Sequence, residues 1–255
     1  MTRRSLDDWL DYISSQHPAT IALGLDRVRQ VAERMGISRP AVVITVGGTN
    51  GKGSTCAMLE RILLEAGYRV GLYTSPHLIR YNERVRVQGE DATDGMLVES
   101  FERVEAARQS TALTYFEFGT LGALELFARS GLDAAILEVG LGGRLDAVNI
   151  VDADVSCVVS VDLDHQAFLG NDRESIGFEK AGIYRAGRAA IFGDTNPPDR
   201  LVAHARGIGA DLQLLGRDFR YEAHERQWDF VGRRGAKRAL PIPALRGRWQ
   251  LKNAS

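Results

Sequence analysis

Residues 41–55 read AVVITVGGTNGKGST, a run of apolar, β-branched residues that breaks into a glycine-rich turn. Lys52 and two hydroxyl residues follow, and the helical pattern of residues 53–66 begins among them. Glycines let backbone N–H groups approach anionic oxygens, and a helix N-terminus adds partial positive charge. The segment therefore predicts a strand, loop and helix that hold a polyphosphate, with Lys52 reaching the terminal phosphates as a point charge.

This loop departs from the strict nucleotide-loop pattern. Five places before Gly51 stands Val46 instead of glycine, and Lys52 is followed by Gly53 instead of serine or threonine. The alternative interpretation is a glycine-rich turn that carries a surface lysine. Four glycines crowd this short stretch directly after a buried-type strand, and they favour the nucleotide loop. These glycines are Gly47, Gly48, Gly51 and Gly53.

Composition and charge set the broad class. A chain of 255 residues can bury a sizeable core as one large or two small domains. The formal net charge is -1 with both signs interspersed, which argues against a nucleic-acid or anionic-membrane surface. Cys56 and Cys157 lack metal-type spacing and fit buried thiols in a reducing cytosol. With no signal-peptide stretch and no run of about 18 apolar residues, we expect a soluble, cytoplasmic protein.

Strand and helix patterns alternate along most of the chain. Residues 5–15 and 26–36 predict two short amphipathic helices ahead of the first strand. The expected strands are 41–47, 69–75, 133–140, 155–161 and 189–194, and the expected helices are 53–66, 93–110 and 114–131. After about residue 210 the pattern changes to an antiparallel hairpin, and the last residues predict the start of a helix near Asn253. The alternation predicts an α/β fold with a mostly parallel sheet covered by helices.

Three expected strands run into polar residues at their carboxyl ends, where parallel sheets gather ligands. The first ends in Thr74-Ser75-Pro76-His77, the second delivers Glu138, and the third delivers Asp162, Asp164 and His165. A carboxylate inside the apolar stretch around Glu138 is costly to bury unless it is paired or metal-bound. Backbone N–H groups that satisfy Glu138 are the alternative to a metal role, and His165 by itself reads as a structural histidine.

Two further residues stay ambiguous on local pattern alone. His77 follows Pro76, where a turn-stabilising role competes with a ligand contact. Lys180 lies in ESIGFEKAGIYR and by itself reads as a surface lysine on a helix, paired with Glu179 or Glu174.

Several motifs together resemble one family. These are GTNGKGST, LYTSPHLIRYNERVRVQGE, TYFEFGTL, ILEVGLGGRLDAVNIVDADV, DHQAFLG and RESIGFEKAGIYR. From about residue 6 to the end the chain is similar to the bacterial folylpolyglutamate synthase/dihydrofolate synthase family of the Mur ligase superfamily. The resemblance also accounts for the loop, because this family's nucleotide loop departs from the strict pattern in the same way. The resemblance implies an N-terminal lead-in over 1–40 with a pterin-site loop, and a P-loop ATP-binding central domain over 41–255.

The resemblance implies an ATP-dependent amide ligase of folate biosynthesis. A pteroate or folate carboxylate attacks the γ-phosphate of ATP to give an acyl phosphate, and the amine of L-glutamate then displaces phosphate. Such chemistry needs charge neutralisation and in-line positioning more than a covalent nucleophile. The implied cofactors are ATP and Mg²⁺, with two ions expected. The implied partners are small-molecule substrates of a monomeric enzyme, with no nucleic acid and no membrane.

The resemblance also assigns residues to roles. The family's nucleotide contacts fall on Thr49, Asn50, Gly51, Lys52, Gly53, Ser54 and Asn253. Its metal ligands fall on Ser75, Glu138, His165 and Lys180, of which Lys180 matches a lysine that the family carbamylates into an anionic oxygen ligand. Lys52, Lys180 and His165 are the expected catalytic residues. The pterin site falls on Leu23, Gly24, Leu25, Asp26, Thr114, Tyr115, Phe116, Glu117, Asp146 and Ala147.

Phe116 has two interpretations. Its ring could stack on a pterin, an offset aromatic contact worth about 1 kcal/mol. Ordinary core packing is the alternative.

Family members run well beyond this length and end in a second α/β domain. That domain supplies further ATP contacts and much of the glutamate site. We expect this chain to lack it, as a fragment or truncated form, and by itself to bind nucleotide weakly and catalyse poorly.

Three other functions compete with this expectation. Another Mur-type ligase is disfavoured by the pterin-loop motifs LGLDRV and TYFEFGT. A plain P-loop phosphotransferase is disfavoured because Glu138, His165 and Lys180 together suit a two-metal ligase. A catalytically silent nucleotide- or pterin-binding module remains open, and glutamate-dependent ATP turnover would separate it from an enzyme.

Overall fold

The computed structural model describes residues 4–17, 19 and 21–255. Residues 1–3, 18 and 20, which belong to the expected lead-in over 1–40, lie outside the described part. The chain divides into two compact units. The first comprises Met1–Val43, Glu60–Leu141 and Leu145–Asp152, and the second comprises Ile44–Leu59, Gly142–Arg144 and Ala153–Ser255.

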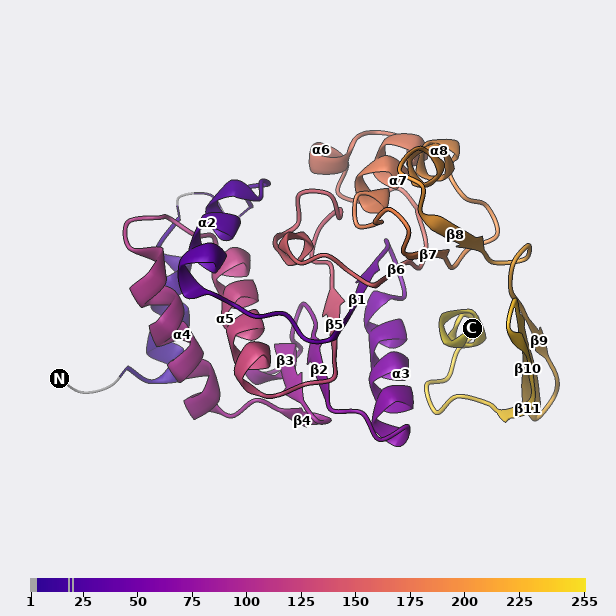
Figure 1. The fold of residues 1–255 in the computed structure, drawn as a ribbon, viewed down its shortest axis with the longest axis horizontal. Coiled ribbons are helices and arrows are strands. Elements are labelled where there is room, and N and C mark those ends of the chain that lie inside the picture. The colour runs from indigo at the N-terminus through magenta and orange to yellow at the C-terminus, as the bar shows by residue number, and fades with distance from the viewer. Residues whose placement is uncertain (1–3, 18, 20) are drawn as a thin grey trace. The chain divides into compact units, whose positions relative to one another are not determined.

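The first unit combines a layer of helices with part of the predicted sheet (Figure 1). Its helices are α1 (Leu6–Ser14), α2 (Asp26–Met35), α4 (Asp94–Arg108) and α5 (Tyr115–Arg129), close to the ranges expected. Its strands are β2 (Val70–Tyr73), β3 (Val85–Val87), β4 (Glu90–Asp91) and β5 (Ala134–Glu138), in the order β4-β3-β2-β5. β2 and β5 are parallel, and β3 and β4 add antiparallel strands at the edge. The 3-10 turns η1 (Tyr81–Arg84) and η2 (Ala147–Ile150) complete the unit.

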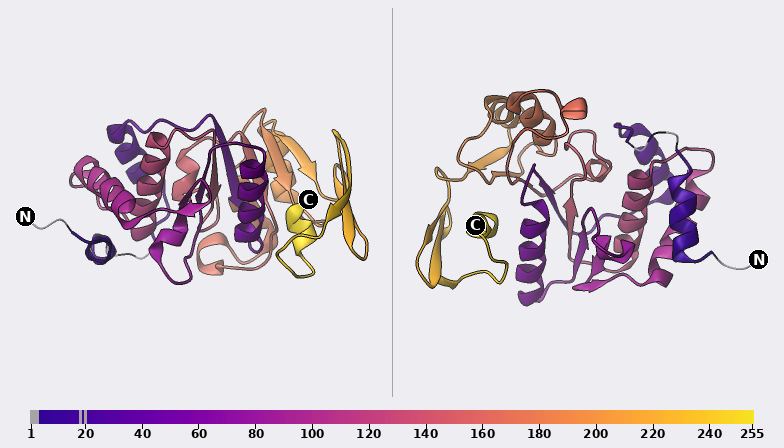
Figure 2. Two further views of the ribbon diagram at one scale, coloured as in Figure 1. Left: turned by 90° about the horizontal axis from the view of Figure 1, so that it is seen from below. Right: turned by 180° about the vertical axis from the view of Figure 1, so that it is seen from behind.

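Helix α5 is the centre of this unit's core. Thr114 caps its first turn, and the Glu117 side chain accepts the Thr114 N–H in return, so two backbone donors are satisfied at the helix start. Phe118, Leu121 and Phe127 of α5 are fully buried. Helices α4 and α5 lie side by side, as the left view of Figure 2 shows. Burying large apolar side chains of this kind contributes about 1.5–3 kcal/mol each.

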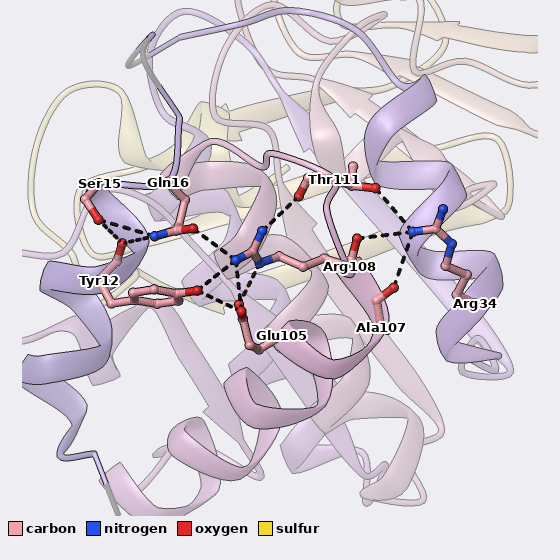
Figure 3. Close-up of polar contacts among 8 residues, drawn as sticks. All are labelled: Tyr12, Ser15, Gln16, Arg34, Glu105, Ala107, Arg108 and Thr111. Atoms are coloured by element: carbon pink, nitrogen blue, oxygen red, sulfur yellow. Dashed lines mark hydrogen bonds and ion pairs between the residues drawn. The ribbon is translucent and has the colours of Figure 1, made fainter.

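A polar cluster inside the helical layer joins α1 to α4 (Figure 3). Arg108 is only 8% exposed. Its guanidinium donates to both carboxylate oxygens of Glu105, to the Tyr12 hydroxyl at 2.8 Å and to Gln16 at 2.9 Å. Arg34 of α2 donates to the Arg108 carbonyl at 3.1 Å, so a cation lies at the C-terminal end of α4. The cluster therefore links three helices by part-buried hydrogen bonds.

The second unit is built on strands β1 (Val42–Gly47), β6 (Val155–Val158), β7 (Ala189–Phe192) and β8 (Asp211–Leu214). They run in the order β1-β6-β7-β8, and every neighbouring pair among them is parallel. The unit also holds the first turns of α3 (Lys52–Glu65), then α6 (Gln166–Leu169), α7 (Arg173–Ala181) and α8 (Asp199–Gly207), of which α7 and α8 lie side by side. Gly47, Val158 and Phe192 are paired in register, so the loops that follow these three strands leave at one edge.

The hairpin expected after residue 210 is confirmed as β9 (Arg220–Ala223) and β10 (Gln227–Gly232), which pair antiparallel. A third strand, β11 (Gly235–Pro241), extends it and was not expected from the sequence. The helix start near Asn253 is α9 (Gln250–Ala254), which packs on β9.

No helix in the described part of the chain is both long and apolar enough to cross a membrane. Cys56 and Cys157 are not joined in a disulfide, as expected, and burial raises the pKa of Cys157 to about 12.

Replacing the buried Arg108 should cost far more stability than replacing an exposed arginine. Arg108→Met leaves the Gln16 oxygen and the Glu105 carboxylate without their cation, so we expect a loss of about 2 kcal/mol. Arg61→Met is the matched control, because the Arg61–Glu65 pair is exposed on both sides and should contribute less than about 1 kcal/mol. Urea unfolding of both variants measures the difference. Equal losses would show that the cluster adds nothing beyond a surface pair.

Candidate functional site

The loop after β1 depends on glycine at two positions. Gly48 has a φ of +141°, and a Cβ there would lie 3.1 Å from the backbone nitrogens of Val159 and Ser160. Gly51 has a φ of +90°, and a Cβ there would lie 2.7 Å from the side-chain oxygen of Asn253. Both the backbone conformation and the close approach of neighbouring atoms exclude larger residues.

The same loop is held by the segment that follows β6. The Thr49 N–H donates to the Ser160 carbonyl at 2.9 Å, and the Asn50 N–H donates to the Ser160 hydroxyl at 3.0 Å. That hydroxyl donates to the Asn50 carbonyl at 3.0 Å, and the Asp162 N–H donates to the Thr49 hydroxyl at 3.0 Å. The loop conformation is therefore fixed by the protein itself.

Lys52 is the first residue of α3, and its ammonium lies folded over the loop. It donates to the Gly48 carbonyl at 3.0 Å and to the Thr49 carbonyl at 3.4 Å. The first turn of a helix also has N–H groups without partners in the helix, which here belong to the stretch that includes Gly53 and Ser54. A lysine, a helix N-terminus and a glycine-rich turn thus meet at one place, where they can hold an anionic oxygen group.

Helix α9 packs against this loop and closes one side of a cavity of about 540 Å³. The Gln250 amide donates to the Ser54 hydroxyl at 3.4 Å, and the Thr55 hydroxyl donates to the Asn253 carbonyl at 3.5 Å. Lys252 pairs with Asp194 at 3.3 Å. The cavity is lined by Asn50, Gly51, Ser54, Ser160, Val161, Asp162, Asp194, Trp249, Gln250, Lys252 and Asn253.

His165 and Lys180 also belong to the second unit. His165 precedes α6 with a left-handed φ of 46°, and its half-exposed ring lies 3.7 Å from the Asp164 carboxylate. Lys180 lies in the last turn of α7 and is only 4% exposed. The interpretation of Lys180 as a surface lysine is therefore wrong. The chain turns at Gly143 against the carbonyl oxygens of Glu179 and Lys180, where a Cβ would lie 2.9 Å from each, and this close packing buries the end of α7.

Ser75 and Glu138 lie together in the first unit. Their strands are parallel and in register, with Tyr73 opposite Leu137, so both residues follow at the same edge. The Ser75 N–H donates to the Glu138 carboxylate at 3.2 Å, and Glu138 is 4% exposed. This contact supplies one backbone donor to the buried carboxylate. Within the described residues, no three His, Cys, Asp or Glu side chains form a group that could hold a metal ion.

His77 accepts a hydrogen bond from the Arg84 guanidinium, with 2.8 Å between His77 Nδ1 and Arg84 Nε. Burial lowers the pKa of His77, and the charge of Arg84 lowers it further. A neutral imidazole in this position orients Arg84 after the turn at Pro76.

The residues assigned to a pterin site are all in the first unit, and several have structural contacts. The buried Glu117 pairs with Arg27 at 2.7 Å. The buried Asp146 accepts the N–H groups of Leu141 and Val148. The Gly24 N–H donates to the Leu145 carbonyl at 3.4 Å, which brings the loop at Leu23–Asp26 next to Asp146 and Ala147.

Phe116 is half-buried and packs on two neighbours. Its ring centroid lies 6.0 Å from that of Tyr73, and a Cβ on Gly140 would lie 2.6 Å from the Phe116 ring. The ring therefore packs directly on the backbone of the glycine-rich segment after β5.

Several known proteins are similar to most of this chain in sequence and in fold. No family model matches the chain. The dihydrofolate synthase/folylpolyglutamate synthase of Escherichia coli K12 is 53% identical over 241 residues, which is 94% of this chain and 57% of the relative. The structure of E. coli FolC in complex with DHPP and ADP has a TM-score of 0.95 at 50% identity, covering 98% of this chain and 61% of that one.

A bifunctional folylpolyglutamate synthase/dihydrofolate synthase with Mn, AMPPNP and L-glutamate bound has a TM-score of 0.91 at 47% identity, covering 98% of this chain and 60% of that one. The chain belongs to the dihydrofolate synthase/folylpolyglutamate synthase family. It spans little more than half the length of the curated relative from E. coli.

Sequence patterns missed several residues that contact the assigned residues or line the cavity beside the glycine loop. Arg27 holds Glu117 at the start of α5, and Asp194, Trp249 and Lys252 line the cavity beside the glycine loop. Asp194 follows β7 at the edge where the loops after β1 and β6 also leave. The rule that ligands gather at the carboxyl ends of parallel strands could have found it. Nothing in the local pattern around Trp249 indicates that it reaches the cavity.

A second cavity, of about 470 Å³, lies in the first unit. Its lining includes Arg29, Pro40, Val43, Leu124 and Leu137 and none of the residues that the sequence assigns to a site. The family resemblance gives it no role.

Proposed function

We propose that this family member is an ATP-dependent ligase that joins L-glutamate to dihydropteroate, and also to folates, through an acyl phosphate. The observation that carries the proposal is the glycine loop with Lys52 at the start of α3, fixed by Ser160 and facing a cavity of about 540 Å³. The chain spans 57% of its E. coli relative, so the complete reaction is part of the proposal.

The nucleotide would bind at the glycine loop. The proposed phosphate contacts are Thr49, Asn50, Gly51, Lys52, Gly53 and Ser54, with Asn253 as a further contact. The ADP and AMPPNP bound to related structures support this assignment. Lys52 would leave the Gly48 and Thr49 carbonyls to meet the phosphates. Its charge would oppose the negative charge that develops during phosphoryl transfer.

The proposed metal ligands are Ser75, Glu138, His165 and Lys180. Glu138 fits a hard cation, because it is a buried carboxylate at the end of a parallel strand. The Mn ion in a related structure supports a divalent metal in this family. When bound, Mg²⁺ would neutralise phosphate charge. A second ion is proposed at Lys180, whose burial is consistent with a neutral or carbamylated side chain.

The acceptor substrate would bind to the first unit, at Leu23–Asp26, Thr114–Glu117, Asp146 and Ala147. Thr114, Glu117 and Asp146 support the site by capping helices, since their side chains are engaged with backbone N–H groups. Tyr115 and Phe116 are the ring-bearing members. The half-buried Phe116 offers a face for stacking while it packs on Tyr73.

We also propose that the chain is divided by function into the lead-in over 1–40 and the P-loop domain over 41–255.

The second candidate function is a silent nucleotide- or pterin-binding module. Glutamate-dependent ATP turnover decides between the two.

Lys52→Ala should abolish nucleotide binding and ligation while the fold persists. Removing a preorganised donor to developing phosphate charge typically reduces turnover at least about 100-fold. Calorimetric titration with MgADP and mass-spectrometric detection of glutamylated product measure the effect. Lys237→Ala, on the exposed strand β11, is the matched control and should behave as the wild type. Normal turnover in Lys52→Ala would remove the phosphate role.

Glu138→Gln should weaken the metal dependence of turnover far more than binding of the pterin substrate. Glutamine keeps the shape of the side chain but lacks the charge that a hard cation needs. We would titrate Mg²⁺ at saturating ATP and compare the exposed control Glu225→Gln. An unchanged Mg²⁺ curve in Glu138→Gln would take this carboxylate out of the metal site.

Lys180 should be carbamylated in the active protein. The neutral amine would attack CO₂ and release one proton, and the new carboxylate would carry the negative charge that a metal favours. Labelling with ¹³CO₂ followed by ¹³C NMR should detect the carbamate. Lys180→Ala should lose activity and regain part of it with short carboxylic acids in solution. An unmodified Lys180 in fully active protein would contradict the proposal.

A further inference from the structure

The cavity of about 470 Å³ in the first unit has no role in the proposed reaction. Its volume lies in the range of small-molecule sites, about 300–1,000 Å³. Part of its lining comes from β1, α5 and β5, and these side chains are buried and apolar. They are Val43, Leu124, Ala135 and Leu137. The apolar part of a ligand would therefore leave water when it enters, which favours binding.

The charged members of this lining are exposed, and they carry two charges of each sign. They are Arg29, Glu33, Arg39 and Asp152. The Arg39 guanidinium is engaged with the chain itself, because it donates to the Pro40 carbonyl at 3.2 Å and to the Asp152 carbonyl at 3.1 Å. Asp152 has a further partner as well. Arg29 and Glu33 are therefore the charged groups of the lining that can meet a ligand.

Arg29 and Glu33 place one positive and one negative charge close together on α2. They are four residues apart in the sequence, a spacing that puts side chains next to each other on a helix. Within the described residues, neither side chain forms an ion pair or a hydrogen bond. The two charges are complementary to a ligand head group that itself carries both signs, with a carboxylate at Arg29 and an ammonium at Glu33. An α-amino acid has such a head group, and a large apolar side chain on it matches the buried part of the lining.

We propose that this cavity binds a free α-amino acid with a large apolar side chain, at residues other than those assigned to nucleotide, metal or acceptor. The apolar side chain would contact Leu124 and Leu137, while Arg29 and Glu33 would bind the head group. Burial of apolar area would supply most of the affinity, since ion pairs of exposed side chains contribute little. The two charges would instead select amino acids over apolar acids and apolar amines. The apolar lining would exclude L-glutamate, because the charge of its side chain is costly to bury.

Methyl NMR on the full chain would locate the ligand directly. L-tryptophan should shift the methyl signals of Val43, Leu124 and Leu137 and leave that of Val231, in β10, unchanged. Tryptamine lacks the carboxylate of tryptophan and indole-3-propionate lacks its ammonium. Each should bind about 2- to 5-fold more weakly, the range expected for one exposed ion pair. L-glutamate should leave the three cavity methyl signals unchanged.

Substitutions on α2 separate the two charges. Arg29→Gln should weaken L-tryptophan about 2- to 5-fold and leave tryptamine unaffected, whereas Glu33→Gln should weaken L-tryptophan and leave indole-3-propionate unaffected. Both residues are exposed, so the fold should persist. Gln30→Ala is the matched control, because Gln30 is exposed on the same helix but outside the lining.

Three results would overturn the inference. L-tryptophan could leave the cavity methyl signals unchanged, tryptamine and indole-3-propionate could bind as tightly as L-tryptophan, or Arg29→Gln and Glu33→Gln could bind it as the Gln30→Ala control does. Shifts of the cavity methyl signals that weaken with each lost charge, on the ligand or on α2, would support the site. Neither set of results depends on ATP turnover, so the proposed ligase function is tested separately.

Discussion

The contact between the glycine loop and Ser160 is the constraint on which the nucleotide site depends. Ser160 bonds the backbone of Thr49 and Asn50 through both its carbonyl and its hydroxyl, and the absence of a side chain on Gly48 allows this approach. These contacts within the protein hold the shape of the loop. Lys52 and the first turn of α3 are positioned by the same contact.

The two units bury charged side chains of different kinds. In the first unit, Glu138, Glu117 and Asp146 are buried carboxylates that accept backbone N–H groups. In the second, Lys180 is a buried amine and the Lys252–Asp194 pair lines the cavity. Charges of this kind are costly to bury, and they are retained where folding or chemistry requires them. Helix capping explains why Glu117 and Asp146 are buried. It does not explain Glu138, which lies in β5, or Lys180, which lies inside α7.

The long helices α4 and α5 were predicted from the sequence more accurately than the edges of the sheet, whereas α6 and α8 were not predicted. The pattern of α4 and α5 is long and ends at clear caps, so its boundaries followed from local residues. β3 and β4 were missed because they have three and two residues and pair antiparallel with strands fixed elsewhere. β11 was missed for a similar reason, since its pairing with β10 forms only when the chain turns at Arg233–Gly235.

The sequence by itself determined the glycine loop, the parallel α/β order, the strand-end residues and the family resemblance, because each is encoded in a continuous stretch of chain. Tertiary structure decided which of those residues meet. It buried Lys180 in the last turn of α7 and brought Ser75 to Glu138 across paired strands. It also placed Trp249 in the lining of the cavity beside the glycine loop, although the two are nearly 200 residues apart in the sequence. Such contacts depend on chain segments far apart in sequence, whose meeting no local pattern of residues records.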